Sequence, residues 1–157
     1  MMTIQSGEYS RTILIVDDAY SERLCYQQYL MRSTKYRYQF ITSGIGEETS
    51  FLYQRYRPDV VLLDYSLPAS DPSAIIKQLR DLNAGRHVPV IVTLEESKRA
   101  DAQSKRAMAA GAHYSLLKER ITADRLRAIV EKTIFSAEDS VVTKIESINK
   151  ANRGNAE

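Results

Sequence analysis

The sequence of 157 residues contains no long apolar run, and its first residues do not resemble a secretion signal. A helix needs about 18 or more consecutive apolar residues to cross a bilayer, and no such stretch is present. The N-terminal segment MMTIQSGEYSR also lacks the basic stretch and the apolar core of a secretion signal. We therefore expect a cytoplasmic protein.

Cysteine and histidine are scarce, and neither sign of charge is in large excess. The single cysteine, Cys25, excludes an intrachain disulfide, and because it lies in an expected helix we interpret it as a small core residue. With only two histidines and no group of thiolates, a zinc site is poorly supported. The 22 basic and 20 acidic residues are interspersed and leave a net charge of +2, so we expect no direct binding of nucleic acid.

What the sequence does have is an ordinary globular composition, with 43% hydrophobic and 27% charged residues. Short apolar segments alternate with amphipathic segments along the chain. This (βα)5 pattern predicts an α/β fold with a doubly wound, parallel, five-stranded sheet and helices on both faces. The predicted strands are 12–16, 36–42, 59–63, 88–93 and 113–117, and the predicted helices are 21–32, 47–56, 72–82, 97–110 and 122–135. Asp71 is the predicted N-cap of the third helix, with Pro72 at its first position.

Charged and polar residues stand at the carboxyl ends of the predicted strands. Asp17 and Asp18 follow the first strand and Asp64 follows the third. Thr93 ends the fourth strand, and Lys118 follows the fifth. Ligands of doubly wound sheets bind outside these ends, at the point where the strand order reverses. With the common order 2-1-3-4-5, the reversal would bring the three aspartates to one crevice.

Three neighbouring carboxylates need a cation, because unit charges about 5 Å apart repel by roughly 3 kcal/mol per pair at an effective dielectric near 20. A set of oxygen ligands favours Mg²⁺, which keeps several waters and leaves a position for a phosphate oxygen. Lys118 adds a positive charge and Thr93 a hydroxyl donor, and both suit a phosphoryl group. These residues together indicate an aspartyl-phosphate site, in which a carboxylate attacks phosphorus.

Four segments carry a resemblance to a known family, namely ILIVDD, PDVVLLDYSLP, VPVIVT and AAGAHYSLLK. In this order they resemble the first strand with its acidic pair, the phosphoacceptor strand, the switch strand and the final lysine segment of a response-regulator receiver domain. The resemblance covers residues 11–135 and implies a CheY-like, flavodoxin-like fold.

The resemblance also implies a role for each residue at the strand ends. Asp64 would accept the phosphoryl group, Thr93 would hydrogen-bond it and Lys118 would form an ion pair with it. The implied ligands of Mg²⁺ are Asp17, Asp18, Asp64 and the backbone carbonyl of Ser66. The implied partners are a sensor histidine kinase or histidine phosphotransfer protein and a downstream effector. Such a chain would act in two-component or phosphorelay signalling and would catalyse only its own phosphorylation and dephosphorylation.

Three residues depart from the family pattern. Leu94 follows Thr93 where a small residue is usual, Ser115 replaces an aromatic residue on the last strand, and Glu119 replaces a proline. We predict that Leu94 crowds the entrance to the phosphorylation site and that Glu119 competes for Lys118. The departures leave open a pseudo-receiver that binds its partners without phosphorylation. A Mg²⁺-dependent phosphohydrolase is a third hypothesis, although no second catalytic acid is evident beside Asp64.

The sequence is interpreted as one domain with two flanking segments. Residues 1–10 form an N-terminal lead, residues 11–135 the receiver domain, and residues 136–157 either a polar tail or a linker helix. In the last segment, apolar residues follow a heptad-like spacing at Ile134, Val141, Ile145 and Ile148. If this segment is helical, it suggests a homodimer or a connection to a further domain.

Overall fold

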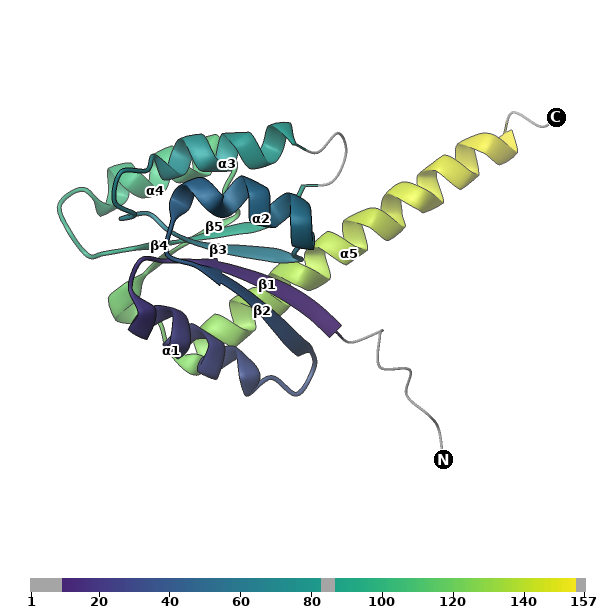
Figure 1. The fold of residues 1–157 in the computed structure, drawn as a ribbon. Helices are drawn as coiled ribbons and strands as arrows, with labels where there is room; N and C mark the ends of the chain where they lie inside the picture. The colour runs from purple at the N-terminus through teal and green to yellow at the C-terminus, as the bar shows by residue number, and fades with distance from the viewer. Residues whose placement is uncertain (1–9, 83–86, 155–157) are drawn as a thin grey trace.

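The computed structural model describes residues 10–82 and 87–154. Their core is a five-stranded parallel sheet with the strand order β2-β1-β3-β4-β5, as Figure 1 shows. The predicted fold class and strand order are confirmed. The strands are β1 (Ser10–Val16), β2 (Arg37–Ser43), β3 (Val60–Asp64), β4 (Val90–Leu94) and β5 (Tyr114–Leu117).

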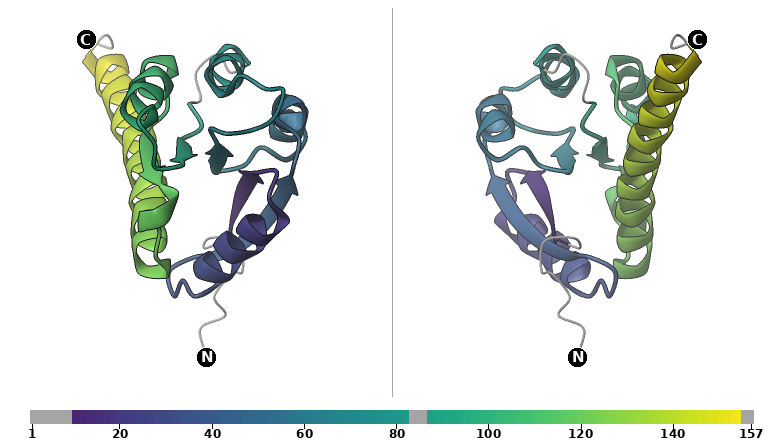
Figure 2. Two further views of the ribbon diagram at one scale, coloured as in Figure 1. Left: turned by 90° about the vertical axis from the view of Figure 1, so that its left-hand side faces the viewer. Right: turned by 90° about the vertical axis from the view of Figure 1, so that its right-hand side faces the viewer.

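Helices cover both faces of the sheet (Figures 1 and 2). The helices are α1 (Tyr20–Met31), α2 (Thr49–Tyr56), α3 (Pro72–Asp81), α4 (Ala100–Ala110) and α5 (Ala123–Gly154). Short 3-10 helices cover Gly46–Glu48, before α2, and Lys118–Arg120, after β5. The predicted helices are all present, but two of them start later than expected. The segment before α2 is wound as a 3-10 helix, and α4 begins three residues after Ser97.

Alternation along the strands divides the apolar core into two layers. Leu14, Val61 and Val92 pack with buried residues of α2, α3 and α4 on one face of the sheet. Their sequence neighbours Ile15, Leu62 and Ile91 pack with α1 and α5 on the other face. All five residues of β3 are buried, since this strand is central and covered on both sides. Asp64, the last residue of β3, is therefore anchored at the end of the buried central strand.

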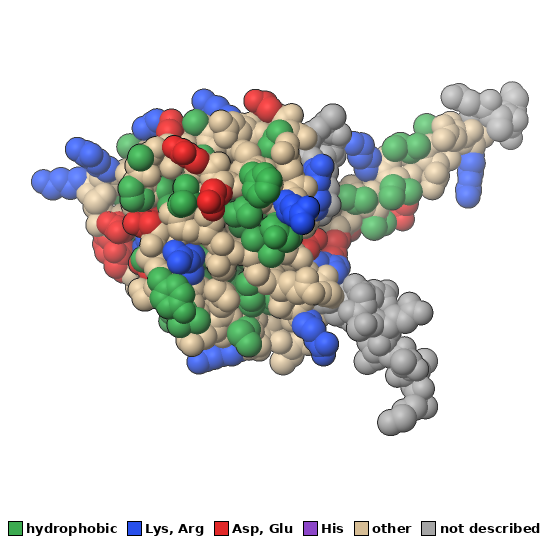
Figure 3. All heavy atoms as spheres, viewed as in Figure 1, with side chains coloured by type: hydrophobic (Ala, Val, Ile, Leu, Met, Phe, Trp, Pro, Cys, Tyr) green, Lys and Arg blue, Asp and Glu red, His purple; other side chains and the backbone are tan. Residues whose placement is uncertain are grey.

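The helix α5 continues past residue 135 to Gly154, so the described part of the C-terminal segment is helical, which is one of the two alternatives that the sequence left open. This part of the helix extends away from the body (Figure 1). The buried residues of α5, Leu126, Val130, Thr133 and Ile134, all lie in its first half. From residue 138 to residue 154 every residue is exposed, including four large apolar residues, Val141, Val142, Ile145 and Ile148. Figure 3 shows hydrophobic side chains along this extension. Arg11 of β1 forms an ion pair with Glu138 at its base. In the described ranges, no helix is long and apolar enough to span a membrane.

The start of α3 has the capping predicted from its sequence. The Asp71 carboxylate accepts a hydrogen bond from the Ser73 backbone N–H at 3.1 Å, and Pro72 occupies the first turn. This cap fixes where the chain leaves the loop after β3 and enters the helix.

We expect Asp71→Ala to lower the free energy of unfolding by about 1 kcal/mol, because the Ser73 N–H loses its acceptor. Urea denaturation followed by circular dichroism measures this change. The control is Asp81→Ala at the exposed last residue of α3, which we expect to change stability by less than about 0.5 kcal/mol. Equal stability of the Asp71→Ala variant and the unmodified protein would contradict the assigned role of the cap.

Candidate functional site

The strand order reverses between β1 and β3, and acidic residues gather there. Asp17 directly follows β1, and Asp64 is the last residue of β3. One carboxylate oxygen from each of Asp17, Asp18 and Asp64 lies within 4.8 Å of the others. Asp17 and Asp64 are buried, whereas Asp18 is exposed. The three aspartates predicted to share one crevice are therefore close together.

Local hydrogen bonds hold one oxygen of each buried aspartate and leave the other without a donor. The Asp17 Oδ1 accepts from the Ala19 N–H at 2.9 Å, and the Asp64 Oδ1 accepts from the Ser66 N–H at 3.0 Å. Both Oδ2 atoms are buried and accept no hydrogen bond. A buried carboxylate oxygen without a donor is unfavourable, so each of these oxygens is a position where a cation or a phosphoryl group would be stabilised.

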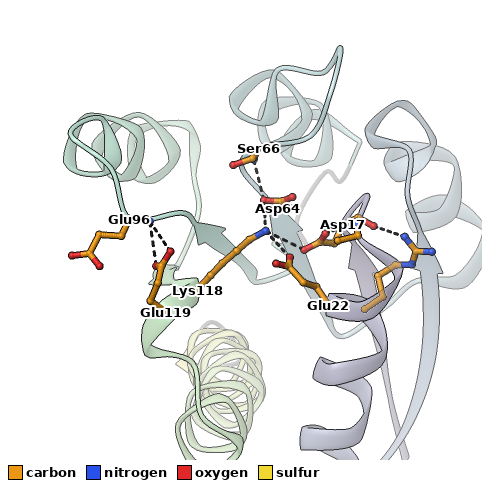
Figure 4. A network of polar contacts seen from close by, with 9 residues as sticks. Asp17, Glu22, Asp64, Ser66, Glu96, Lys118 and Glu119 are labelled. Carbon is orange, nitrogen blue, oxygen red and sulfur yellow. Dashed lines mark hydrogen bonds and ion pairs between the residues drawn. The ribbon is translucent and has the colours of Figure 1, made fainter.

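Lys118, which directly follows β5, points toward the same carboxylates, as Figure 4 shows. Its Nζ lies 3.2 Å from Asp64 Oδ1 and 3.5 Å from Asp17 Oδ2. Thr93 pairs with Asp64 in the register of β3 and β4, and its hydroxyl is buried without a hydrogen-bond partner. The cluster thus combines carboxylates, one ammonium group and one hydroxyl without a hydrogen-bond partner.

A fourth carboxylate, which the sequence did not predict, completes the cluster. Glu22 in the first turn of α1 places its Oε2 at 2.6 Å from Lys118 Nζ, the shortest contact of that ammonium group. The prediction that Glu119 competes for Lys118 is wrong. The Glu119 carboxylate instead accepts a hydrogen bond from the backbone N–H of Glu96, at 3.2 Å (Figure 4). The sequence signal for Glu22 was weak, since an acidic residue in a first helical turn is common for reasons of the helix dipole alone.

The electrostatics follow from burial and from the shared lysine. Burial raises the pKa of Asp17 to about 7, and the nearby carboxylates of Glu22 and Asp64 contribute to this rise. Burial also raises the pKa of Asp64, in opposition to its bonds with Ser66 and Lys118. For Lys118, burial by itself lowers the pKa, but the surrounding carboxylates of Glu22, Asp64 and Asp17 outweigh it and raise the pKa above the usual range.

The residues present fit a divalent cation such as Mg²⁺. The donors are oxygens, the carboxylates carry more negative charge than one lysine neutralises, and two buried oxygens accept no hydrogen bond. In the described residues no other group of three or more histidine, cysteine or acidic side chains offers a comparable set of ligands.

Comparison with known proteins assigns the chain to a family. The response regulator receiver domain matches residues 13–131. The chain belongs to the receiver domain family. Receiver domains are signalling modules of two-component systems, so this chain is a receiver domain of the response-regulator kind.

Individual relatives agree with this assignment. The polar-differentiation response regulator DivK of Brucella anthropi is 27% identical over 105 residues, 67% of this chain and 83% of DivK. Sporulation initiation phosphotransferase F of Bacillus subtilis is 27% identical over 120 residues, 76% of this chain and 90% of the relative. A CheY-like receiver domain protein from Methanospirillum hungatei has the same fold, with a TM-score of 0.71 and 18% identity over 83% of this chain and 98% of that protein.

The structure shows the contacts of two residues that depart from the family pattern, Ser115 and Leu94. Ser115 points toward α4, where its hydroxyl lies 2.5 Å from that of Ser104. Leu94 is 2% exposed and packs in the apolar layer that includes residues of α3 and α4. Its predicted crowding of the site entrance stays a prediction.

The raised pKa of Asp17 predicts a specific pH dependence of stability in the metal-free receiver. The folded state keeps the Asp17 proton up to about pH 7, whereas an unfolded aspartate loses it near 3.8. The folded state therefore binds more protons between these values, and the contribution of Asp17 to stability is lost as pH rises through this window.

We expect the free energy of unfolding of the receiver, measured relative to Asp17→Asn with a chelator present, to fall by about 1 kcal/mol per pH unit between pH 5 and pH 7. The asparagine variant has the same shape and cannot titrate, so the difference reports the Asp17 proton together with its effect on the neighbouring Glu22 and Lys118. Urea denaturation at each pH measures the difference. A difference that does not change with pH would contradict a raised pKa of Asp17.

Proposed function

We propose that this receiver is phosphorylated on Asp64 with Mg²⁺ bound, and that the phosphoryl group switches its contacts with other proteins in a two-component or phosphorelay pathway. The observation that supports this most strongly is the surroundings of Asp64. Its carboxylate is buried at the end of β3, has one oxygen without a donor, and lies beside Lys118. Thr93 adds an unpartnered hydroxyl on the adjacent strand.

The proposed metal ligands are the carboxylates of Asp17, Asp18 and Asp64 and the backbone carbonyl of Ser66. Bound Mg²⁺ would neutralise part of the negative charge on the carboxylates and on the transferring phosphoryl group. The residues themselves supply the remaining chemistry. Ser66 N–H and Lys118 orient the Asp64 carboxylate through its Oδ1.

In the proposed transfer, an Asp64 carboxylate oxygen attacks the phosphorus of a phosphohistidine on the partner. The new O–P bond forms while the P–N bond breaks, and the imidazole nitrogen keeps the electron pair and takes up a proton. The Lys118 ammonium and the Thr93 hydroxyl are the groups that would bind the phosphoryl oxygens. Hydrolysis by water would later return the carboxylate and release inorganic phosphate.

The phosphoryl group is proposed to come from a histidine kinase or a histidine phosphotransfer protein. The two histidines of this chain, His87 and His113, both lie outside the described helices, so neither has the helical setting of a phosphodonor. The named function of the relative sporulation initiation phosphotransferase F supports a place in a chain of phosphoryl transfers. The output is proposed to be a change in population of the surface formed by β4, β5 and their helices, read by an effector.

Intact mass spectrometry after incubation with acetyl phosphate and Mg²⁺ tests this proposal. We expect one phosphoryl adduct that hydroxylamine removes, since an acyl phosphate reacts with this nucleophile. Asp64→Asn removes the attacking carboxylate and is expected to abolish the adduct. The control Asp81→Asn, at the exposed end of α3, is expected to keep it. If neither acetyl phosphate nor a histidine kinase gives an adduct, and beryllofluoride does not bind, the phosphoacceptor role is wrong and the pseudo-receiver is favoured.

A further inference from the structure

Lys118 has three acidic neighbours, and the shortest contact is with a residue that has no role in the proposed transfer. Its Nζ lies 2.6 Å from Glu22 Oε2, compared with 3.2 Å from Asp64 and 3.5 Å from Asp17. Glu22 belongs to α1, whereas Lys118 follows β5, so this contact joins two segments that are far apart in the sequence (Figure 4). In the unphosphorylated receiver, the ammonium group is therefore held mainly by Glu22.

Burial differs between Glu22 and the other two carboxylates. The side chain of Glu22 is 35% exposed, whereas those of Asp17 and Asp64 are 2% and 1% exposed. Water can solvate Glu22 when Lys118 leaves it, while a buried carboxylate would lose its counter-charge without replacement. The contact between Glu22 and Lys118 is thus the one of the three that can open without leaving a buried charge unpaired.

We propose that Glu22 is a positioning residue that holds Lys118 in the unphosphorylated receiver and thereby slows phosphorylation of Asp64. The inference rests on the proposed function of Asp64. Phosphorylation requires Lys118 to turn from Glu22 to the oxygens of the phosphoryl group, so the pair must open before the ammonium group can stabilise the developing charge. Glu22 also places a fourth negative charge close to the position that an anionic donor must reach.

The direct test compares phosphorylation rates of three proteins at saturating Mg²⁺. Glu22→Gln keeps the length and shape of the side chain and removes its charge. We expect it to be phosphorylated by acetyl phosphate about fivefold faster than the unmodified receiver, a factor that corresponds to the loss of one partly exposed ion pair. The matched control is Glu119→Gln, because Glu119 is acidic and near the same loop but binds the Glu96 backbone N–H. It should leave the rate unchanged.

A double-mutant cycle tests whether Glu22 acts through Lys118. In a Lys118→Met background, the proposed partner is absent, so the added Glu22→Gln change is expected to give no further increase in rate. A fivefold increase that persists in this background would mean that Glu22 acts by its charge alone, and would overturn the positioning role.

A second readout does not require phosphorylation. In the metal-free protein, labelling of the Lys118 amine by an amine-reactive reagent is expected to rise severalfold in Glu22→Gln and to stay unchanged in Glu119→Gln. Peptide mass spectrometry measures it at this lysine. Unchanged labelling in Glu22→Gln would overturn the proposed contact.

The two proposals fail in different ways. If the unmodified receiver forms the adduct on Asp64 and Glu22→Gln forms it at the same rate, only the role of Glu22 is wrong. If neither protein forms an adduct, the phosphoacceptor function fails and the inference fails with it.

Discussion

The structure depends on one electrostatic constraint, which is that two buried carboxylates, Asp17 and Asp64, share one ammonium group, Lys118. At separations of a few ångströms, unit charges interact by several kcal/mol even at an effective dielectric near 20. The fold places these carboxylates next to each other because both stand at the carboxyl end of a central parallel strand. The apolar layers on each side of the sheet prevent them from moving apart toward water.

This constraint links stability to function in the receiver. In a metal-free site with Asp17, Asp64 and Glu22 all ionised, the negative charges outnumber the one positive charge of Lys118. Burial and the neighbouring carboxylates therefore both disfavour the ionised form of Asp17 and raise its pKa. The site relieves the excess by keeping a proton, by sharing Lys118, or by binding a cation. The same property makes it suitable for a phosphoryl group, because groups that already compensate charge need little rearrangement when that charge moves to phosphorus.

The sequence predicted the parts of the site that follow from strand ends. The apolar run before Asp64 identifies a central strand, and the parallel order then brings Asp17, Thr93 and Lys118 to the same edge. Asp71 and Pro72 were likewise readable, because capping depends on residues adjacent in sequence. Glu22 was not, since its contact with Lys118 joins residues 96 positions apart and depends on how the start of α1 lies relative to the segment after β5. Glu119 was assigned to Lys118 from sequence proximity alone, but the 3-10 turn at Lys118–Arg120 directs its side chain to Glu96.

The long helix α5 connects the core beneath the site with an exposed extension. Its buried residues Leu126, Val130 and Ile134 pack in the same apolar layer as Ile91 of β4 and Leu116 of β5. Thr93 lies on β4 and Lys118 directly follows β5, and these are the groups proposed to bind a phosphoryl group. A helix is stiff over this length, so a small rotation at its packed base displaces the exposed apolar residues of the extension by a larger amount. Since close-packed cores shift between discrete arrangements rather than deform continuously, we expect a change at the site to reach the extension as a change in the direction of α5.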